Sequence, residues 1–392
     1  MDKKQVYTFE SDLYSDYKNK DDANLVEDEN IYGETNDQPI TKPFNPNDID
    51  VDIATVNLGS IIEQLENEEI DLQPDFQRST DVWNHTKKSR LIESILLGLP
   101  LPSFYFSEDP VTKKLSVIDG LQRLCAIRDF ILKAHKKDAL RLQGLQFLYN
   151  FEGKTYLDLE RPEIKRIKSL KITMNTLRKG TPNDVKFIIF QRVNTAGEPL
   201  TPQEMRHALN QGTAANFIRE LAELDSFKMA TNHSVKSKRM QDRDFANRFV
   251  AFFIGYNEYS GELDTFLNDK MGELNRMSQE RLANIRQVFD ETMKCCYTIF
   301  GDDTFRRRYD KNDRKKPISK AVFDSLSVNI AWLTNSQREL LIRNAETFKD
   351  GLINLFNDKA FNAAISTGTG QKYSVDKRFD SIKKLISRII NL

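Results

Sequence analysis

The feature that most constrains this chain is the change of hydrophobic pattern within residues 115–131. Leu115-Ser-Val-Ile118 is short, apolar and rich in β-branched residues, which favours a strand. Asp119-Gly120 follows as a turn dipeptide, and apolar residues then recur at helical spacing up to Ile131. The segment therefore predicts a strand, a tight turn and a helix in direct succession, as in an α/β domain.

The pattern on both sides of this junction predicts a two-domain chain. We expect helices near residues 58–65, 87–97 and 182–193 and strands near residues 70–72, 102–106 and 170–176. The 102–106 and 115–118 strands, separated by a polar turn, predict a hairpin. Thr201-Pro-Gln-Glu204 has the cap, proline and glutamate of a helix start, and helical periodicity continues from there. The expected domains are an acidic flexible tail at 1–48, an α/β domain at 49–199 and a mainly α-helical domain at 200–392.

Composition narrows the class of protein. Lysine plus arginine equals aspartate plus glutamate at 58 each, so the net charge neither implies nor excludes nucleic-acid binding. The acidic residues before Val51 suit either a solvated tail or an arm that docks on a partner. With 3 cysteines, 2 of them adjacent, a disulfide framework is not expected, and a reducing, cytoplasmic compartment is. No stretch approaches the roughly 20 apolar residues of a membrane helix, so we expect no membrane partner.

The strand-to-helix turn is the expected binding site. Unpaired backbone N–H groups at the positive end of a helix bind phosphates. Gly120 would let a phosphate approach closely, Arg123 would add a forked cationic donor, and Gln122 can hold a ribose, a water or a phosphate oxygen. Asp119 would repel a phosphate unless it caps the helix or helps to hold a metal ion such as Mg²⁺. Both roles of Asp119 stay open.

A second cluster lies about forty residues earlier, in Gln73-Pro-Asp-Phe-Gln77-Arg78. This Gln-Arg pair follows a predicted strand and can converge on the same anion as the turn. The alternative is a surface ion pair of Arg78 with Asp75 or Asp81, which would contribute under about 1 kcal/mol.

A third cluster runs from Phe190 to Arg206, with the sequence FQRVNTAGEPLTPQEMR. It joins two predicted helices and is dense in side chains suited to phosphate or base recognition, among them Asn194 and Arg206. Asn194 and Gly197 are equally suited to forming the turn itself. The cluster thus predicts either ligand contacts or a structural connection.

Four blocks in this order resemble the N-terminal-domain family of GmrSD-type modification-dependent restriction endonucleases, whose signature is Asp-Gly-Gln-Gln-Arg. They are PDFQR with Trp83, LIESILLGLPLP at 91–102, IDGLQRL at 118–124 and the 190–206 cluster, within Leu58 to Arg206. That family is similar to a variant of the ParB/sulfiredoxin fold. The resemblance implies that Asp119, Gln122 and Arg123 act in nucleotide hydrolysis and that Gln77, Arg78, Gly120, Arg123, Asn194 and Arg206 bind a nucleoside triphosphate, with Mg²⁺ at Asp119.

Two departures from the family limit what carries over. Leu121 stands where the signature has its first glutamine, and a leucine there is expected to pack inward. Longer members also carry a C-terminal His-dependent nuclease domain, whereas His85, His135, His207 and His233 form no pair at metal-ligand spacing. The resemblance therefore favours nucleotide binding over hydrolysis, in a standalone member without the nuclease module.

Three functions fit these observations. The first is a nucleotide-binding, NTP-hydrolysing or regulatory component of an anti-phage restriction system that acts with DNA and a separately encoded effector. The second is a ParB-like, metal-dependent DNA nuclease with Asp119, Asp75 and Glu93 as metal ligands. The third is a non-enzymatic, antitoxin-like partner of a toxin or RNase. The sequence does not indicate which nucleotide, which DNA modification or which oligomeric state applies.

Two weaker signals lie in the helical part. Arg306-Arg-Arg308 together with KNDRKKPISK at 311–320 is a local basic run that suits either a nucleic-acid backbone or a solvated loop. Ser366-Thr-Gly-Thr-Gly-Gln-Lys372 is similar to a phosphate loop but lacks the Walker spacing.

Overall fold

A computed structural model describes residues 26–31, 50–72, 83–108, 113–178, 181, 189, 201–210 and 212–391. The chain divides into two compact units. The first unit comprises Asp37–Glu223 and Lys236–Gln287, and the second comprises Met1–Asn36, Leu224–Val235 and Val288–Leu392. The helix expected at 182–193 falls almost entirely outside the described residues.

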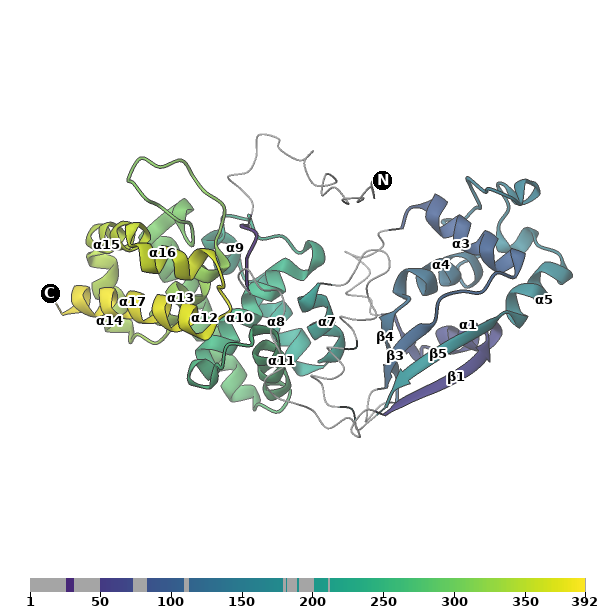
Figure 1. Cartoon of the computed structure of the whole chain (residues 1–392), viewed down its shortest axis with the longest axis horizontal. Helices are drawn as coiled ribbons and strands as arrows, with labels where there is room; N and C mark the ends of the chain where they lie inside the picture. Colours follow the sequence, from purple (N-terminus) through teal and green to yellow (C-terminus); the bar gives the residue numbers. More distant parts are fainter. Residues whose placement is uncertain are drawn as a thin grey trace, which may run out of the picture. The chain divides into compact units, whose positions relative to one another are not determined.

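The first unit is built on a mixed sheet of five strands, in the order β1-β5-β3-β4-β2 (Figure 1). The strands are β1 (Val51–Asn57), β2 (Ile70–Asp71), β3 (Phe104–Glu108), β4 (Leu115–Asp119) and β5 (Lys171–Leu177). β3 and β4 pair antiparallel, which confirms the predicted hairpin, while β5 pairs parallel with β3 and β2 parallel with β4. The edge strand β1, antiparallel to β5, was not expected from the sequence.

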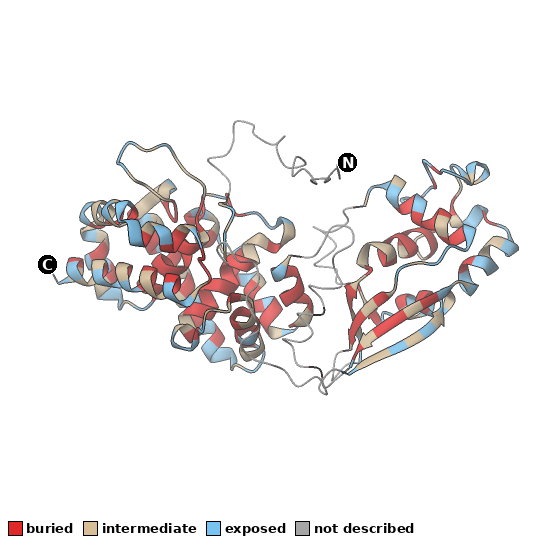
Figure 2. Cartoon of the chain, viewed as in Figure 1, coloured by how far each residue is buried: buried red, intermediate tan, exposed pale blue. Residues whose placement is uncertain are grey.

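Helices cover one face of this sheet. They are α1 (Leu58–Glu66), α3 (His85–Leu97), α4 (Leu121–Ile131) and α5 (Arg161–Ser169), and their apolar residues form one core with the sheet. Phe104 and Phe106 belong to that core and are fully buried. Buried residues are concentrated in the sheet and in the helix faces that cover it (Figure 2). Because strand side chains alternate, Ile118 and Leu177 face the other way, where they meet Met205 and Ala208 of α7 (Pro202–Leu209).

Local signals set the ends of the helices around β4. Asn84 caps α3 by accepting a hydrogen bond from Lys87 N at 2.9 Å, and Gly98 ends it in the left-handed conformation with φ 76°. At α7, Thr201 and Glu204 form the predicted capping box. The helix start predicted at Thr201 is therefore confirmed, while α3 ends at Leu97 as expected but begins at His85, two residues before the expected start.

Helices make up the rest of the described chain. The first unit adds α8 (Thr213–Glu223), α10 (Gln241–Gly255) and α11 (Leu263–Leu274). The second unit contains α9 (Asp225–Ala230), α13 (Lys320–Ala331), α14 (Asn335–Arg343), α15 (Ala345–Asn357), α16 (Lys359–Ser366) and α17 (Lys372–Ile390), and α12 (Gln279–Phe300) has residues in both units. A mixed α/β part followed by a mainly helical part is therefore confirmed. Within the described residues, no helix combines the length and apolarity needed to cross a membrane.

A buried ion pair joins α3 to α4. Lys88 Nζ lies 2.8 Å from Asp129 Oδ2, and their side chains are only 5% and 11% exposed. Burial disfavours the charge of Asp129, but hydrogen bonds from Lys88, Lys133 and Arg128 outweigh it and lower its pKa to about 2. Since α4 begins at the strand-to-helix turn, this pair fixes the helix that carries the candidate site.

Replacing Asp129 by Asn tests this link. At pH 7 we expect the free energy of unfolding to fall by about 3 kcal/mol, because Lys88 keeps a buried charge without a carboxylate partner. The wild-type contribution of Asp129 is present above its unfolded pKa and is lost as pH falls toward about 2, which should remove about 2 kcal/mol. Urea denaturation from about pH 7 to 2 should therefore show the two proteins converging. Asp138→Asn, at an exposed position, is the control and should leave the free energy of unfolding and its pH dependence unchanged. If Asp129→Asn and the wild type differed by the same free energy of unfolding at every pH, the role given to the Asp129 carboxylate would be wrong.

Candidate functional site

The predicted strand-to-helix turn is present as expected. β4 ends at Asp119, Gly120 is the N-cap residue with φ 99°, and α4 begins at Leu121. Gly120 has no side chain to cap the helix, and the Asp119 carboxylate bonds Arg123 and the N–H of Gly120. A glycine N-cap at the end of a strand brings the positive end of the helix close to the backbone turn, which is the arrangement that favours an anion.

Arg123 holds the turn together. Its Nη2 donates to Asp119 Oδ2 at 2.6 Å and to the carbonyl of Ser103 at 3.2 Å, and its Nη1 donates to the carbonyl of Pro102. The guanidinium also lies over the ring of Phe104, 4.4 Å from its centroid. Arg123 therefore links the end of β4 to the chain that enters β3, and these donors are directed at protein atoms.

The Asp119–Arg123 pair is costly to bury. Burial raises the pKa of Asp119 although Arg123 and the N–H of Gly120 act against the rise. Burial likewise lowers the pKa of Arg123 although Asp119 acts against the fall. Both directions mean that desolvation outweighs the mutual attraction of the two charges. The pair is thus better understood as a constraint on position than as a large source of stability.

Gly120 is required by packing as well as by its backbone. A Cβ atom at this residue would lie 2.4 Å from Cδ1 of Phe104 and 3.2 Å from Nη2 of Arg123. From the sequence, we expected glycine at position 120 because it lets a phosphate approach the backbone closely. In the structure, the space next to Gly120 is filled by the Phe104 ring, and the positive φ alone already disfavours other residues.

Gln122 connects the turn to the chain before α3. Its Oε1 accepts a hydrogen bond from Trp83 N at 3.4 Å. Trp83 is the first described residue after the segment that carries Gln77 and Arg78. Leu121, as predicted, packs against the core rather than projecting toward a ligand. Gln77, Arg78 and Asn194 themselves lie outside the described residues, as does Asp75.

Arg206 is buried in a polar network between helices. Its guanidinium donates to Gln203 Oε1, Asp264 Oδ1 and Asp244 Oδ1 at 2.9, 2.7 and 3.0 Å, and the residue is 2% exposed. These partners come from α7, α11 and α10. The predicted phosphate contact of Arg206 is therefore wrong, because its guanidinium is directed at two carboxylates and an amide inside the protein.

Glu93 also has a structural partner set. Its carboxylate accepts hydrogen bonds from the backbone N–H groups of Gln146, Phe147 and Leu148 at 3.0, 2.7 and 2.8 Å. Burial opposes the charge, but these donors prevail and the pKa of Glu93 is lowered. The described residues contain no group of three or more His, Cys, Asp or Glu side chains arranged to hold a metal ion. Glu93 and Asp119 are each held by other contacts in the described chain.

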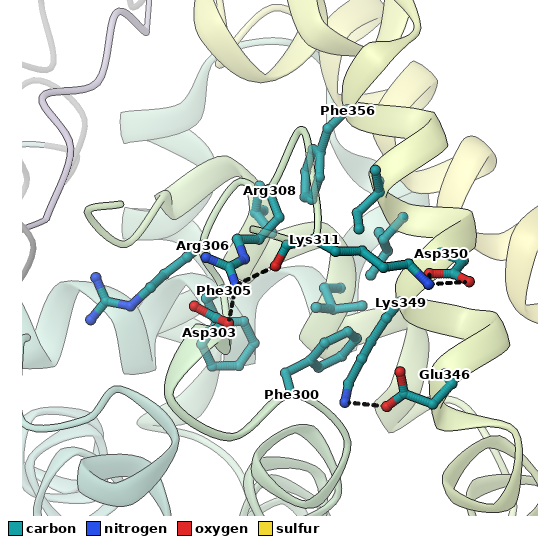
Figure 3. A pocket seen from close by; sticks show the side chains of 14 residues that line it. Phe300, Asp303, Phe305, Arg306, Arg308, Lys311, Glu346, Lys349, Asp350 and Phe356 are labelled. Carbon is teal, nitrogen blue, oxygen red and sulfur yellow. Dashed lines mark hydrogen bonds and ion pairs between the residues drawn. The ribbon is translucent and has the colours of Figure 1, made fainter. Parts of the chain in front are cut away.

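A separate cavity of about 250 Å³ lies in the second unit (Figure 3). Phe300, Phe305 and Phe356 are among its apolar lining. Ion pairs at the pocket join Arg308 to Asp303, Lys311 to Asp350 and Lys349 to Glu346 at 3.0, 2.6 and 2.7 Å. Each of these three cations already has a carboxylate partner, so the cavity is better suited to an apolar group than to a phosphate.

Comparison with known proteins identifies the domain around the turn. Residues 58–211 match the model of a family described as GmrSD restriction endonuclease, N-terminal domain. This match covers β4, α4 and α7. No curated protein and no solved structure matches the chain. The likeness to the ParB/sulfiredoxin fold therefore stays a prediction.

Substitution of Gly120 separates the two reasons for glycine at the turn. Gly120→Ala should lower the free energy of unfolding by about 1–2 kcal/mol for the left-handed backbone and by roughly 1–3 kcal/mol more for the contact with Phe104. Gly98→Ala is the matched control, because Gly98 has φ 76° but no atom within 4 Å of the added Cβ. Urea denaturation of both variants measures the difference. Equal losses would show that Phe104 does not restrict this position.

Proposed function

We propose that the domain at residues 58–211, which matches the model of the GmrSD restriction endonuclease N-terminal domain, binds a nucleoside triphosphate as the sensor or regulatory part of an anti-phage restriction system that acts on DNA. The observation that carries the proposal is the start of α4. Its N-cap residue is Gly120, at the end of a sheet strand, and a glycine provides no capping side chain. Such a turn offers backbone N–H groups and the positive helix end to phosphate oxygens.

Gln77 and Arg78 are the side chains that we add to this site. The described residues on either side of their segment contact the two elements that meet at the turn. Ile70 and Asp71 pair parallel with Leu115 and Ser116 at the start of β4, and Trp83 N donates to Gln122 Oε1 of α4. A guanidinium at Arg78 would supply the forked donor that suits a phosphate, since the guanidinium of Arg123 is directed at Asp119 and two carbonyls. Asn194 is proposed as a further contact on the basis of the family pattern alone.

Arg123 and Asp119 then act as positioning residues. Their pair holds the turn against the start of β3, so that the backbone of residues 121–122 keeps one orientation. Because Leu121 packs inward, the domain has no amide side chain at that place in the signature to orient an attacking water. We therefore propose binding as the primary activity and hydrolysis as a secondary one, with Gln122 as the side chain nearest to such a role.

Mg²⁺ would accompany the triphosphate rather than occupy a protein site. Within the described residues, Asp119 and Glu93 do not fit a protein-held cation, because the Asp119 carboxylate pairs with Arg123 and that of Glu93 with backbone N–H groups. Magnesium commonly keeps several waters and binds substrate phosphates directly. The same contacts of Asp119 and Glu93 favour nucleotide binding over the metal-dependent nuclease hypothesis. A separately encoded effector or toxin protein remains our proposed partner for the regulated step.

Isothermal titration calorimetry with ATP, GTP, CTP and UTP, each with and without Mg²⁺, tests the proposal. We expect at least one triphosphate to bind and the corresponding nucleoside to show no heat, because the phosphates supply the contacts. Arg78→Ala should weaken binding by at least roughly tenfold, the loss of one charge-assisted contact of about 1.4 kcal/mol.

Arg141→Ala is the matched control for that measurement, because it removes the same charge from an exposed residue of the same domain. Its affinity should equal that of the wild type. Absence of heat with all four triphosphates under both conditions would reject the nucleotide proposal, and equal weakening by both variants would reject the role given to Arg78.

A further inference from the structure

Part of the predicted acidic tail is docked in the second unit. Val26 forms a parallel bridge with Ile318, and Asn30 forms one with Thr367. Glu27 N donates to the carbonyl of Ile318 at 2.8 Å. In return, Thr369 N and Gly370 N donate to the carbonyls of Asn30 and Ile31 at 3.0 and 2.9 Å. Residues 26–31 therefore lie extended between two segments that are far away in sequence, one after the basic run and one between α16 and α17.

The side chains of this segment alternate between inward and outward. From Glu27 onward, Glu27, Glu29 and Ile31 are half-buried and Asp28 and Asn30 are exposed, while Val26 before them is also half-buried. An extended chain has this period of two, so one face of the segment meets the protein and the other meets solvent. The inward face carries two carboxylates, which is unusual for a buried face and requires specific partners.

Both inward carboxylates have such partners. Glu27 Oε2 lies 2.8 Å from Nη2 of Arg307, and its carboxylate also bonds the side chain of Ser319, which is 2% exposed. Glu29 Oε1 accepts a hydrogen bond from Thr369 Oγ1 at 2.8 Å, and Thr369 is 1% exposed. This surface therefore binds two carboxylates, Glu27 and Glu29, which are separated by one residue.

Arg307 is held in place independently of the segment. Its Nη1 donates to Ser366 Oγ at 2.8 Å and its Nη2 to the carbonyl of Ile365 at 2.6 Å, both at the end of α16. A guanidinium anchored in this way is pre-organised for a carboxylate. The sequence left the roles of the basic run and of the Ser366–Lys372 loop open. In the structure, both segments contact residues 26–31, an acidic extended peptide.

We propose that this groove, formed by Arg307, Ile318, Ser319, Thr369 and Gly370, is a binding site for an extended acidic peptide of the pattern Glu-x-Glu, and that residues 26–31 fill it in cis until a partner protein with such a segment displaces them. Main-chain hydrogen bonds with alternate side-chain contacts are the mode by which sheet edges bind peptides. The partner would compete with a segment tethered at high effective concentration, so the tail sets a threshold for binding.

The charges favour exchange over permanent docking. Burial raises the pKa of Glu27 even though Arg307 and Ser319 act against the rise, so desolvation of this carboxylate outweighs its attraction to Arg307. Most of the remaining attraction comes from a few main-chain hydrogen bonds. An isosteric Glu27→Gln change should accordingly leave the segment docked in part, whereas a lysine at 27 would face Arg307 and expel it.

The test uses a fluorescent peptide of residues 24–33, NLVEDENIYG, and the full-length protein in an anisotropy titration. The wild-type chain should bind it weakly because its own segment competes. Glu27→Lys should bind it at least roughly tenfold more tightly, in line with a cis competitor at an effective concentration well above its dissociation constant. A peptide with lysine in place of both glutamates should not bind either protein.

Asp28→Lys is the matched control, since it makes the same change of charge one residue away on the exposed face. It should behave as the wild type. Hydrogen exchange supplies the second readout: the amides of Thr369 and Gly370 should lose protection in Glu27→Lys alone, while those of α13 stay protected and report an intact fold. Three outcomes would overturn the proposal: no gain in peptide binding over Asp28→Lys, unchanged protection of Thr369 and Gly370, or binding of an oligonucleotide but not the peptide by Glu27→Lys.

Discussion

The ring of Phe104 sets the geometry on which the candidate site depends. It is fully buried at the start of β3, it fills the space where a Cβ of residue 120 would lie, and it carries the guanidinium of Arg123 on its face. With that space taken, only glycine fits the turn, and its left-handed backbone lets the chain pass from β4 into α4 within one residue. The helix then starts from an N-cap residue without a side chain, and this start is the feature on which the proposed phosphate site rests.

The ion pairs of the first unit differ in what they contribute. Asp129 gains enough from three cationic neighbours to lower its pKa to about 2, so the link between α3 and α4 stabilises the fold fully above the unfolded pKa of an aspartate and loses this contribution as pH falls toward 2. Asp119 and Arg123 show the reverse, since burial disfavours both charges. The Asp119–Arg123 pair costs free energy but orients the turn, as a positioned binding site requires. The Asp129 cluster lies further along α4 and can offset that cost.

Sequence reasoning succeeded where the signal was local. The hairpin, the Asp119-Gly120 junction, the inward Leu121 and the Thr201 cap each rest on a few neighbouring residues, and the structure contains all of them. Strand β1 was missed because an edge strand with half-exposed side chains lacks an apolar run. Arg206 was misjudged for another reason: its partners Asp244 and Asp264 are 38 and 58 residues away, and no local pattern announces them. The role of Phe104 at Gly120 depends on sheet register, which the sequence did not specify.

The balanced total charge has a structural meaning in the second unit. Arg307, Arg308 and Lys311 belong to the basic run, yet each is paired with a carboxylate: Glu27, Asp303 and Asp350. A nucleic-acid backbone would have to displace several carboxylates held at short distances to reach these cations, and each displaced carboxylate would then repel it. An acidic peptide faces a smaller obstacle, because it replaces one carboxylate by another of the same kind and reuses the main-chain hydrogen bonds. Of the three, the cation at 307 is the one whose partner lies on a separate extended segment, so it is the place where exchange requires the least rearrangement of the fold.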